Sequence, residues 1–213
     1  MITLPSINQI KKCQKTNPWS FGNNVLYRLC AENPKHIKDD VIIAKVWLIG
    51  RSYAAAIERG RSNALENNVS SEEFQTVLVV DAFKNSDIDS RLGVLSKRPL
   101  SYETTPLVLE THNMIMLRIH TITGLEKRSL CSKYLHFHLP EHFFLYDSRA
   151  AQAIGKYVSR IPPEFRSRTE NDKFDNVYSN FFYKALVLRE KIYQEYSILM
   201  TPRQIDNLLL LDE

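Results

Sequence analysis

Apolar residues recur at helical spacing through most of the chain, most densely in residues 41–60. The apolar residues that share one side of a helix there are Ile42, Val46, Ile49, Tyr53 and Ala56. This pattern predicts a buried central helix that ends before Gly60. Lys45, Ser52 and Arg59 are spaced seven residues apart, so we expect their side of the helix to face solvent.

Further segments have the capping residues or the apolar stripe of helices. Ser70 precedes a first turn of carboxylates and predicts one helix start. Pro106 lies early in a second predicted helix, which Gly124 ends. Residues 177–199 give the clearest apolar stripe, and Thr201 precedes a short last helix. Because no segment alternates like a strand for long, the sequence predicts an all-α fold.

The chain reads as one compact helical domain of 213 residues. Residues 1–38 form an N-terminal arm with a helix near 25–31, residues 39–161 supply the core helices, and residues 162–213 supply the C-terminal helices. A polar, proline-containing stretch around Pro162 allows two lobes. In that arrangement the last helix packs back on the arm and leaves a cleft between the halves.

Composition and charge narrow the class of protein only slightly. The chain has 28 Lys and Arg against 24 Asp and Glu, a net charge of +4 that permits nucleic-acid binding without requiring it. Its 3 cysteines include no CxxC pair, and no apolar stretch approaches the ~20 residues of a membrane helix. We therefore expect a cytoplasmic protein with no membrane partner.

The chemically informative stretch runs from Lys133 to Asp147. We expect a short helix over residues 130–137, a loop at Pro140, and a new helix whose N-cap is Asp147. Lys133 has apolar neighbours, and partial desolvation would lower the pKa of its amine and make it a better nucleophile. Asp147 would hold a fixed negative charge at the positive end of a helix dipole.

A lysine on a short helix, followed by a loop and an aspartate that caps the next helix, resembles the helix-hairpin-helix DNA glycosylase superfamily. More narrowly, SKYLHFHLPEHFFLYDSRA is similar to small bacterial proteins with the 8-oxoguanine DNA glycosylase fold. PWSFGNNVLYRLC and AKVWLIGRSYAAAIERG resemble the same group.

This resemblance implies base-excision repair by a DNA N-glycosylase, with or without lyase activity, that removes a modified purine such as 8-oxoguanine. Lys133 would attack C1′ of the sugar and form a Schiff base, while Asp147 would stabilise the developing charge. The expected partner is duplex DNA with a flipped base, bound by a monomer that needs no cofactor.

The chain departs from the superfamily pattern near the turn at Gly124. A helix-hairpin-helix element near residues 115–155 would be degenerate, because Gly124 stands there without the second glycine of the usual hairpin. Lys133 and Asp147 are also closer in sequence than is usual. Lys127 and Arg128, or Arg149, would replace the missing amide grip on phosphate. Lys156, Arg160, Arg166 and Arg168 form a separate basic patch around Pro162, which would follow a phosphate backbone or be only a solvated face.

Several readings stay open beside the catalytic one. Candidate base-pocket residues are Trp47, Tyr53, Tyr134, Phe137, His136 and His138, although an aromatic side chain on an apolar helix more often belongs to the core. We expect no metal site, because histidines two apart on a helix point in different directions. Taken alone, Lys133 would be a solvated lysine on a helix surface, and Asp147 would be a helix cap with no catalytic role. The alternatives are an inactive DNA-binding or interaction module of the same fold, and a phage-defence enzyme that uses the same chemistry.

Overall fold

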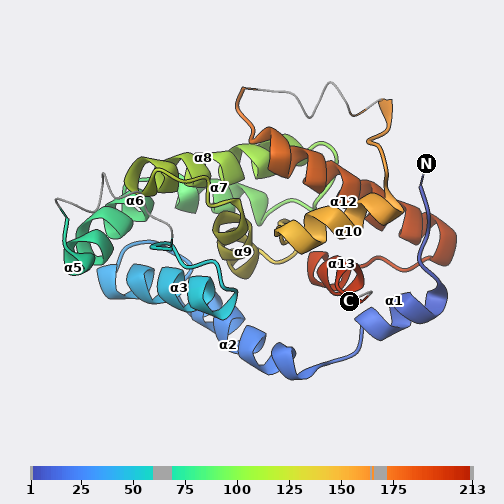
Figure 1. The fold of residues 1–213 in the computed structure, drawn as a ribbon, viewed down its shortest axis with the longest axis horizontal. Coiled ribbons are helices and arrows are strands. Elements are labelled where there is room, and N and C mark those ends of the chain that lie inside the picture. The colour runs from blue at the N-terminus through green and yellow to red at the C-terminus, as the bar shows by residue number, and fades with distance from the viewer. Residues whose placement is uncertain (1, 60–68, 164, 166–171, 212–213) are drawn as a thin grey trace.

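A computed structural model describes residues 2–59, 69–163, 165 and 172–211 (Figure 1). Within these ranges the chain is mainly helical, with one isolated antiparallel bridge between Ile2 and Val158, so the all-α prediction is confirmed. The elements are α1 (Ile7–Cys13), α2 (Pro18–Glu32), α3 (Asp39–Ser52), α5 (Ser71–Glu73), the π-helix η1 (Phe74–Val79), α6 (Val80–Lys84), α7 (Ile88–Leu95), α8 (Thr105–Thr123), α9 (Arg128–His138), α10 (Ser148–Tyr157), α12 (Asn176–Tyr196) and α13 (Pro202–Leu209).

Helix α9 lies at the centre of the arrangement (Figure 1). It packs against α2, α3 and α8 on one side of the molecule. On the other side α10 packs against α12 and α13, and α13 packs against α1. The loop that leaves α9 leads directly to α10, so the segment from α9 to α10 connects the two groups of helices. Among the described residues, no helix is long and apolar enough to cross a membrane.

The caps expected from the sequence set several helix ends. Thr201 and Gln204 form a reciprocal capping box at the start of α13. Gly124 has a φ of 70° and ends α8 in the left-handed conformation that favours glycine. The last helix also packs back on the N-terminal arm, as predicted, through the contact of α13 with α1.

The predicted central helix is too long, because α3 ends at Ser52 rather than before Gly60. Ala54 has a φ of 51°, and the chain then turns back so that the Ala55 amide donates to the Gly50 carbonyl at 2.8 Å. A Cβ atom at Gly50 would lie 3.2 Å from the Ala56 Cα. Glycine at this position therefore allows the turn to pack tightly against the helix.

The prediction that Lys45 faces solvent is wrong. Its side chain is 0% exposed, and its ammonium donates to the carbonyls of Asn33 at 3.0 Å and Lys35 at 3.4 Å. The loop between α2 and α3 supplies both acceptors and covers the amine. Periodicity shows which side of a helix is polar, but it does not show that a loop will fold over that side.

Candidate active site

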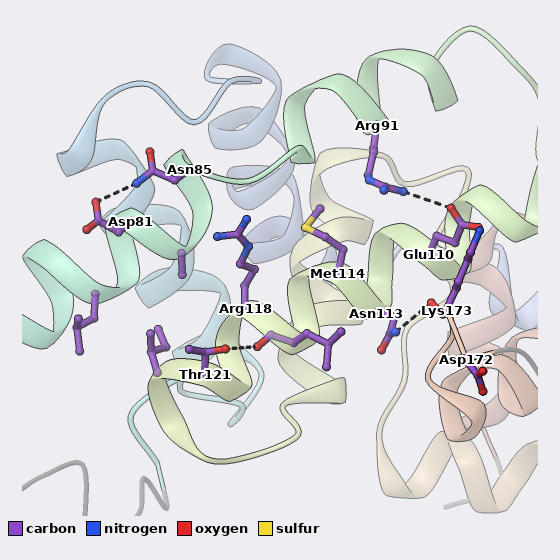
Figure 2. A pocket seen from close by; sticks show the side chains of 14 residues that line it. Asp81, Asn85, Arg91, Glu110, Asn113, Met114, Arg118, Thr121, Asp172 and Lys173 are labelled. Atoms are coloured by element: carbon purple, nitrogen blue, oxygen red, sulfur yellow. Dashed lines mark hydrogen bonds and ion pairs between the residues drawn. The ribbon is translucent and has the colours of Figure 1, made fainter.

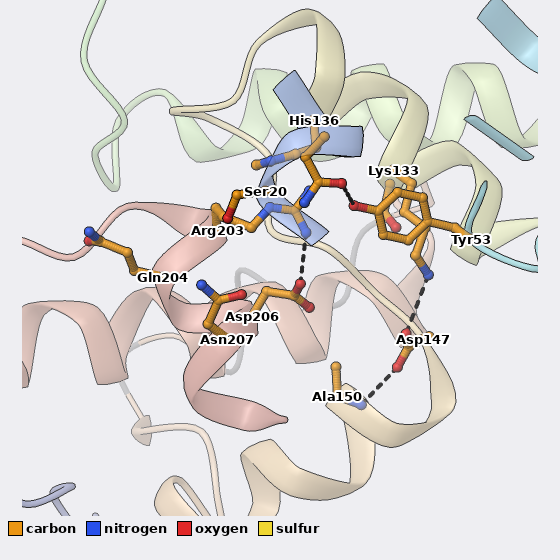
Figure 3. A network of polar contacts seen from close by, with 12 residues as sticks. Ser20, Tyr53, Lys133, His136, Asp147, Ala150, Arg203, Gln204, Asp206 and Asn207 are labelled. Carbon is orange, nitrogen blue, oxygen red and sulfur yellow. Dashed lines mark hydrogen bonds and ion pairs between the residues drawn. The ribbon is translucent and has the colours of Figure 1, made fainter. Parts of the chain in front are cut away.

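Lys133 and Asp147 meet although 14 residues separate them in the sequence (Figure 3). The loop after α9 returns along the helix, where the Tyr146 amide donates to the Ser132 hydroxyl at 3.0 Å. The Lys133 ammonium donates to the Ser129 hydroxyl at 2.7 Å, to the Tyr146 carbonyl at 3.1 Å and to the Asp147 carboxylate at 3.4 Å. The short connection noted in the sequence is thus compatible with direct pairing.

Asp147 is the N-cap of α10, as the sequence predicts. One carboxylate oxygen accepts the Ala150 amide at 2.9 Å and the other faces Lys133. Its burial alone would raise the pKa of Asp147, but the Ala150 hydrogen bond, Lys133 and Arg149 together hold that pKa below its usual value. The carboxylate, 25% exposed, is therefore ionised at neutral pH.

Lys133 is almost covered, with 3% of its surface exposed. Burial lowers the pKa of its amine, and the carboxylates of Asp147 and Asp206 oppose this shift only in part. The Lys133 nitrogen also lies 5.6 Å from the centre of the Tyr53 ring. A lysine with a lowered pKa has a larger neutral, nucleophilic fraction near neutral pH than a solvated lysine.

Sequence reasoning missed two charged residues of α13 that complete this site (Figure 3). Arg203 donates to the Asp206 carboxylate at 3.0 Å and to the Tyr27 hydroxyl at 3.1 Å. Its guanidinium also lies 5.7 Å from the Tyr53 ring centre. Burial raises the pKa of Asp206, and Arg203 and Lys133 offset part of that rise. The sequence did contain a signal for them, because Arg203 and Asp206 are three positions apart on an amphipathic helix and so lie on the same side of it.

Three of the predicted base-pocket residues lie on this side of α9. Tyr53 contacts the Lys133 amine, and Phe137 packs against both Tyr53 and Tyr27. His136 is buried and donates from Nδ1 to the Phe143 carbonyl at 2.8 Å, which leaves Nε2 to accept from the Tyr27 hydroxyl at 2.7 Å. A cavity of about 380 Å³ borders Tyr27, Phe137 and Arg203.

Of the other three predicted pocket residues, His138 borders the same cavity, and its ring also packs against His36 with 4.9 Å between ring centres. Tyr134 is fully buried and donates to His36 at 2.6 Å. His136 and His138 thus diverge, as the helical spacing predicts. Trp47 lies exposed on α3 with the Arg51 guanidinium above its ring.

The two basic residues expected to grip phosphate beside the hairpin turn are held by the protein itself. Lys127 donates to the carbonyls of Ala56 and Arg59. Arg128 pairs with Asp175 at 2.6 Å, and its guanidinium also bonds Glu126. Both cations thus hold neighbouring segments together, and two carboxylates offset the charge of Arg128.

The remaining predicted DNA contacts lie at the surface. Arg149 and Lys156 are exposed on α10, and Arg160 is exposed just beyond it. Arg166 and Arg168 lie outside the described residues. Helices α8 and α9 contact each other and are joined by a short turn. The turn amide of Leu125 donates to Thr123, and that of Gly124 donates to His120, so neither is available for phosphate.

A larger cavity, of about 700 Å³, lies between α6 and α8 and away from this site (Figure 2). Its lining includes the exposed Arg118 and the ion pair between Arg91 and Glu110, whose charged atoms are 3.5 Å apart. Apolar side chains such as Met114 also line it. Neither Lys133 nor Asp147 lines this cavity, so it does not belong to the candidate site.

Among the described residues, no group of three or more His, Cys, Asp or Glu side chains is arranged to hold a metal ion. Comparisons with protein-family models, curated proteins and solved structures gave no match. A proposal about function therefore depends on the geometry and electrostatics of the site alone.

Proposed function

We propose that the protein is a DNA glycosylase that removes a modified purine, with Lys133 as the nucleophile and Asp147 as the supporting carboxylate. The observation that carries this proposal is the 3.4 Å approach of the Lys133 amine to the carboxylate that caps α10. A desolvated amine beside an ionised carboxylate is the arrangement that covalent glycoside cleavage requires.

In the proposed reaction the neutral Lys133 amine attacks C1′ as the bond from C1′ to the base nitrogen breaks. The bonding electrons leave with the purine, which takes up a proton, and the attacking nitrogen loses one. Opening of the sugar then gives a Schiff base between Lys133 and C1′. Asp147 stabilises the positive charge that develops at the sugar while the bond to the base breaks.

The cover over Lys133 sets the conditions for substrate binding. Tyr53 and Tyr146 are half-buried at the rim of the site, and Arg203 lies beside Tyr53. A flipped nucleotide has to displace part of this rim before C1′ reaches the amine. The base would extend into the cavity lined by Tyr27, Phe137 and Arg203, of which Phe137 and Arg203 pack beside Tyr53.

Borohydride trapping tests the proposal directly. Duplex oligonucleotides carrying 8-oxoguanine or other modified purines are incubated with the protein and sodium borohydride. We expect a covalent adduct from the wild-type protein and none from Lys133→Gln. Lys191→Gln is the matched control, since Lys191 is an exposed lysine of α12 that is not among the predicted DNA contacts, and it should retain the adduct.

The same experiment separates the alternatives. DNA binding by fluorescence anisotropy without any adduct would indicate a module that binds DNA and lacks the chemistry. An adduct on hypermodified DNA alone would indicate a defence role. Absence of both binding and adduct would overturn the proposal.

A further inference from the structure

The N-terminal part of the chain carries an uneven charge. Residues 2–31 contain Lys11, Lys12, Lys15 and Arg28 and no Asp or Glu. All four side chains are exposed, and none forms an ion pair with a described carboxylate. These residues therefore carry a net charge of +4 by themselves, as much as the whole chain.

Two large aromatic side chains lie within the same segment. Trp19 is 81% exposed and Phe21 is 72% exposed, both in the first turn of α2. Asn17 and Ser20 form a capping box there, and Pro18 occupies the first helical turn, so the backbone that carries the two rings is well fixed. Because the two rings are two positions apart on the helix, they point to different sides: Trp19 lies on the side of Asn23 and Leu26, and Phe21 on the side of Arg28. The exposed Trp19 ring is therefore the one on the side of α2 that packs against the rest of the fold.

This segment also reaches the candidate active site from both sides. On α2, Asn23 accepts from the Tyr53 hydroxyl at 2.6 Å. Helix α1 packs against α13, which carries Arg203 and Asp206 (Figure 1). The N-terminal segment therefore spans the two groups of helices that meet at Lys133.

We propose that this segment binds duplex DNA next to the nucleotide presented to Lys133. We name its binding residues the basic-aromatic arm, which consists of Lys11, Lys12, Lys15 and Trp19. The cations contact backbone phosphates, while the Trp19 ring stacks on a base exposed where the nucleotide leaves the helix. The inference rests on the proposed function and assigns the phosphate contacts that Lys127 and Arg128 cannot supply.

Trp19 and Trp47 are the two tryptophans of the chain, which makes the contact directly observable. In a Lys133→Gln background, which prevents turnover, Trp47→Phe leaves Trp19 as the sole indole and Trp19→Phe leaves Trp47. Addition of an 8-oxoguanine duplex should quench most of the Trp19 emission, because the indole stacks on bases. The Trp47 emission should change little.

Salt dependence tests the cations separately. A triple variant, Lys11→Ala with Lys12→Ala and Lys15→Ala, should lower the slope of log affinity against log salt by about 2 to 3. The matched control replaces three exposed lysines elsewhere, Lys38, Lys97 and Lys191. It should leave the slope nearly unchanged.

The outcomes distinguish the arm from the glycosylase. A wild-type adduct, with Trp19 emission and salt slope both unaffected, overturns the arm and leaves the proposed function in place. Quenching of Trp19 by DNA without any adduct supports the arm and overturns the glycosylase. Trp19 emission that does not respond to DNA overturns the arm. If it then shifts to the blue with rising protein concentration, a second copy covers this face, and if it shifts on addition of anionic vesicles, a membrane does.

Discussion

Two lysines are buried in this fold, and their surroundings differ. Lys45 on α3 donates to the backbone carbonyls of Asn33 and Lys35. Lys133 on α9 donates to a hydroxyl, a carbonyl and the carboxylate of Asp147. Burial lowers the pKa of both amines, to about 8 for Lys45. Desolvation alone therefore does not distinguish a nucleophile from a structural lysine.

The difference lies in what stands beside each amine. Among the described residues, Lys45 has only carbonyl oxygens within hydrogen-bonding distance. These can bind an ammonium group, but they stabilise a positive charge on a bound sugar less than a carboxylate does. Lys133 faces a carboxylate that is 25% exposed and is fixed by its capping hydrogen bond to α10. Only the second arrangement combines a nucleophile, a counter-charge and a rim that a substrate can reach.

The largest expected effect is on turnover. Lys133→Gln should lower the single-turnover rate of base release by at least about 10³-fold, because the attacking group is removed. Lys45→Met should keep the rate within a few-fold of wild type if it remains folded, which circular dichroism checks. An equal loss in the two variants would contradict the distinction drawn between the two lysines.

Asp147→Asn separates the charge of this residue from its capping role. Because Asn caps helices about as well as Asp, α10 should persist with little loss of stability. The rate should fall by about 10²-fold or more, since the developing charge at the sugar loses its partner.

The pH profile of the same variant sharpens the test. The Asp147 carboxylate raises the pKa of Lys133, so its removal should lower that pKa further. The rising limb of the rate against pH should move to lower pH in Asp147→Asn. A limb that stays in place would mean that Lys133 does not control the profile.

Sequence reasoning predicted the elements of the site better than their surroundings. The helix around Lys133 and the cap at Asp147 followed from local signals, namely a proline, a capping carboxylate and apolar periodicity. The burial of Lys45 and the pairing of Arg128 with Asp175 depend on segments far along the chain. Arg203 and Asp206 reach the site only because α13 packs back on the molecule, which spacing within α13 does not encode.

The stability of the fold in alkaline solution tests the burial of Lys45. Its pKa of about 8 in the folded chain lies below the ordinary 10.5, so between these values the unfolded chain binds more protons. Stability therefore rises with pH across this window, by up to about 3 kcal/mol relative to Lys45→Met. Denaturant unfolding from pH 7 to 10.5 measures this difference, which should be constant below pH 8. If the wild-type protein gained no stability relative to Lys45→Met between pH 8 and 10.5, the amine would not be desolvated in the folded chain.

The smallest expected effect concerns the residue next to Lys133. Tyr134 points away from the site, into a buried cluster where Asp89 accepts from His36 at 2.6 Å and His36 accepts from the Tyr134 hydroxyl. Burial and the Lys45 charge lower the pKa of His36 to about 4, so it is neutral at pH 7.

Tyr134→Phe removes the hydroxyl that donates to the His36 ring nitrogen. The loss of this hydrogen bond should lower the unfolding free energy by about 1 kcal/mol and leave base release unchanged. Tyr53→Phe, on the opposite side of α9, loses a hydrogen bond of similar length to Asn23 at the rim of the site. It should weaken substrate binding as well as stability. If Tyr134→Phe slowed base release as much as Tyr53→Phe, the two sides of α9 would not be functionally separate, and the contrast between Lys133 and Lys45 would lose its structural basis.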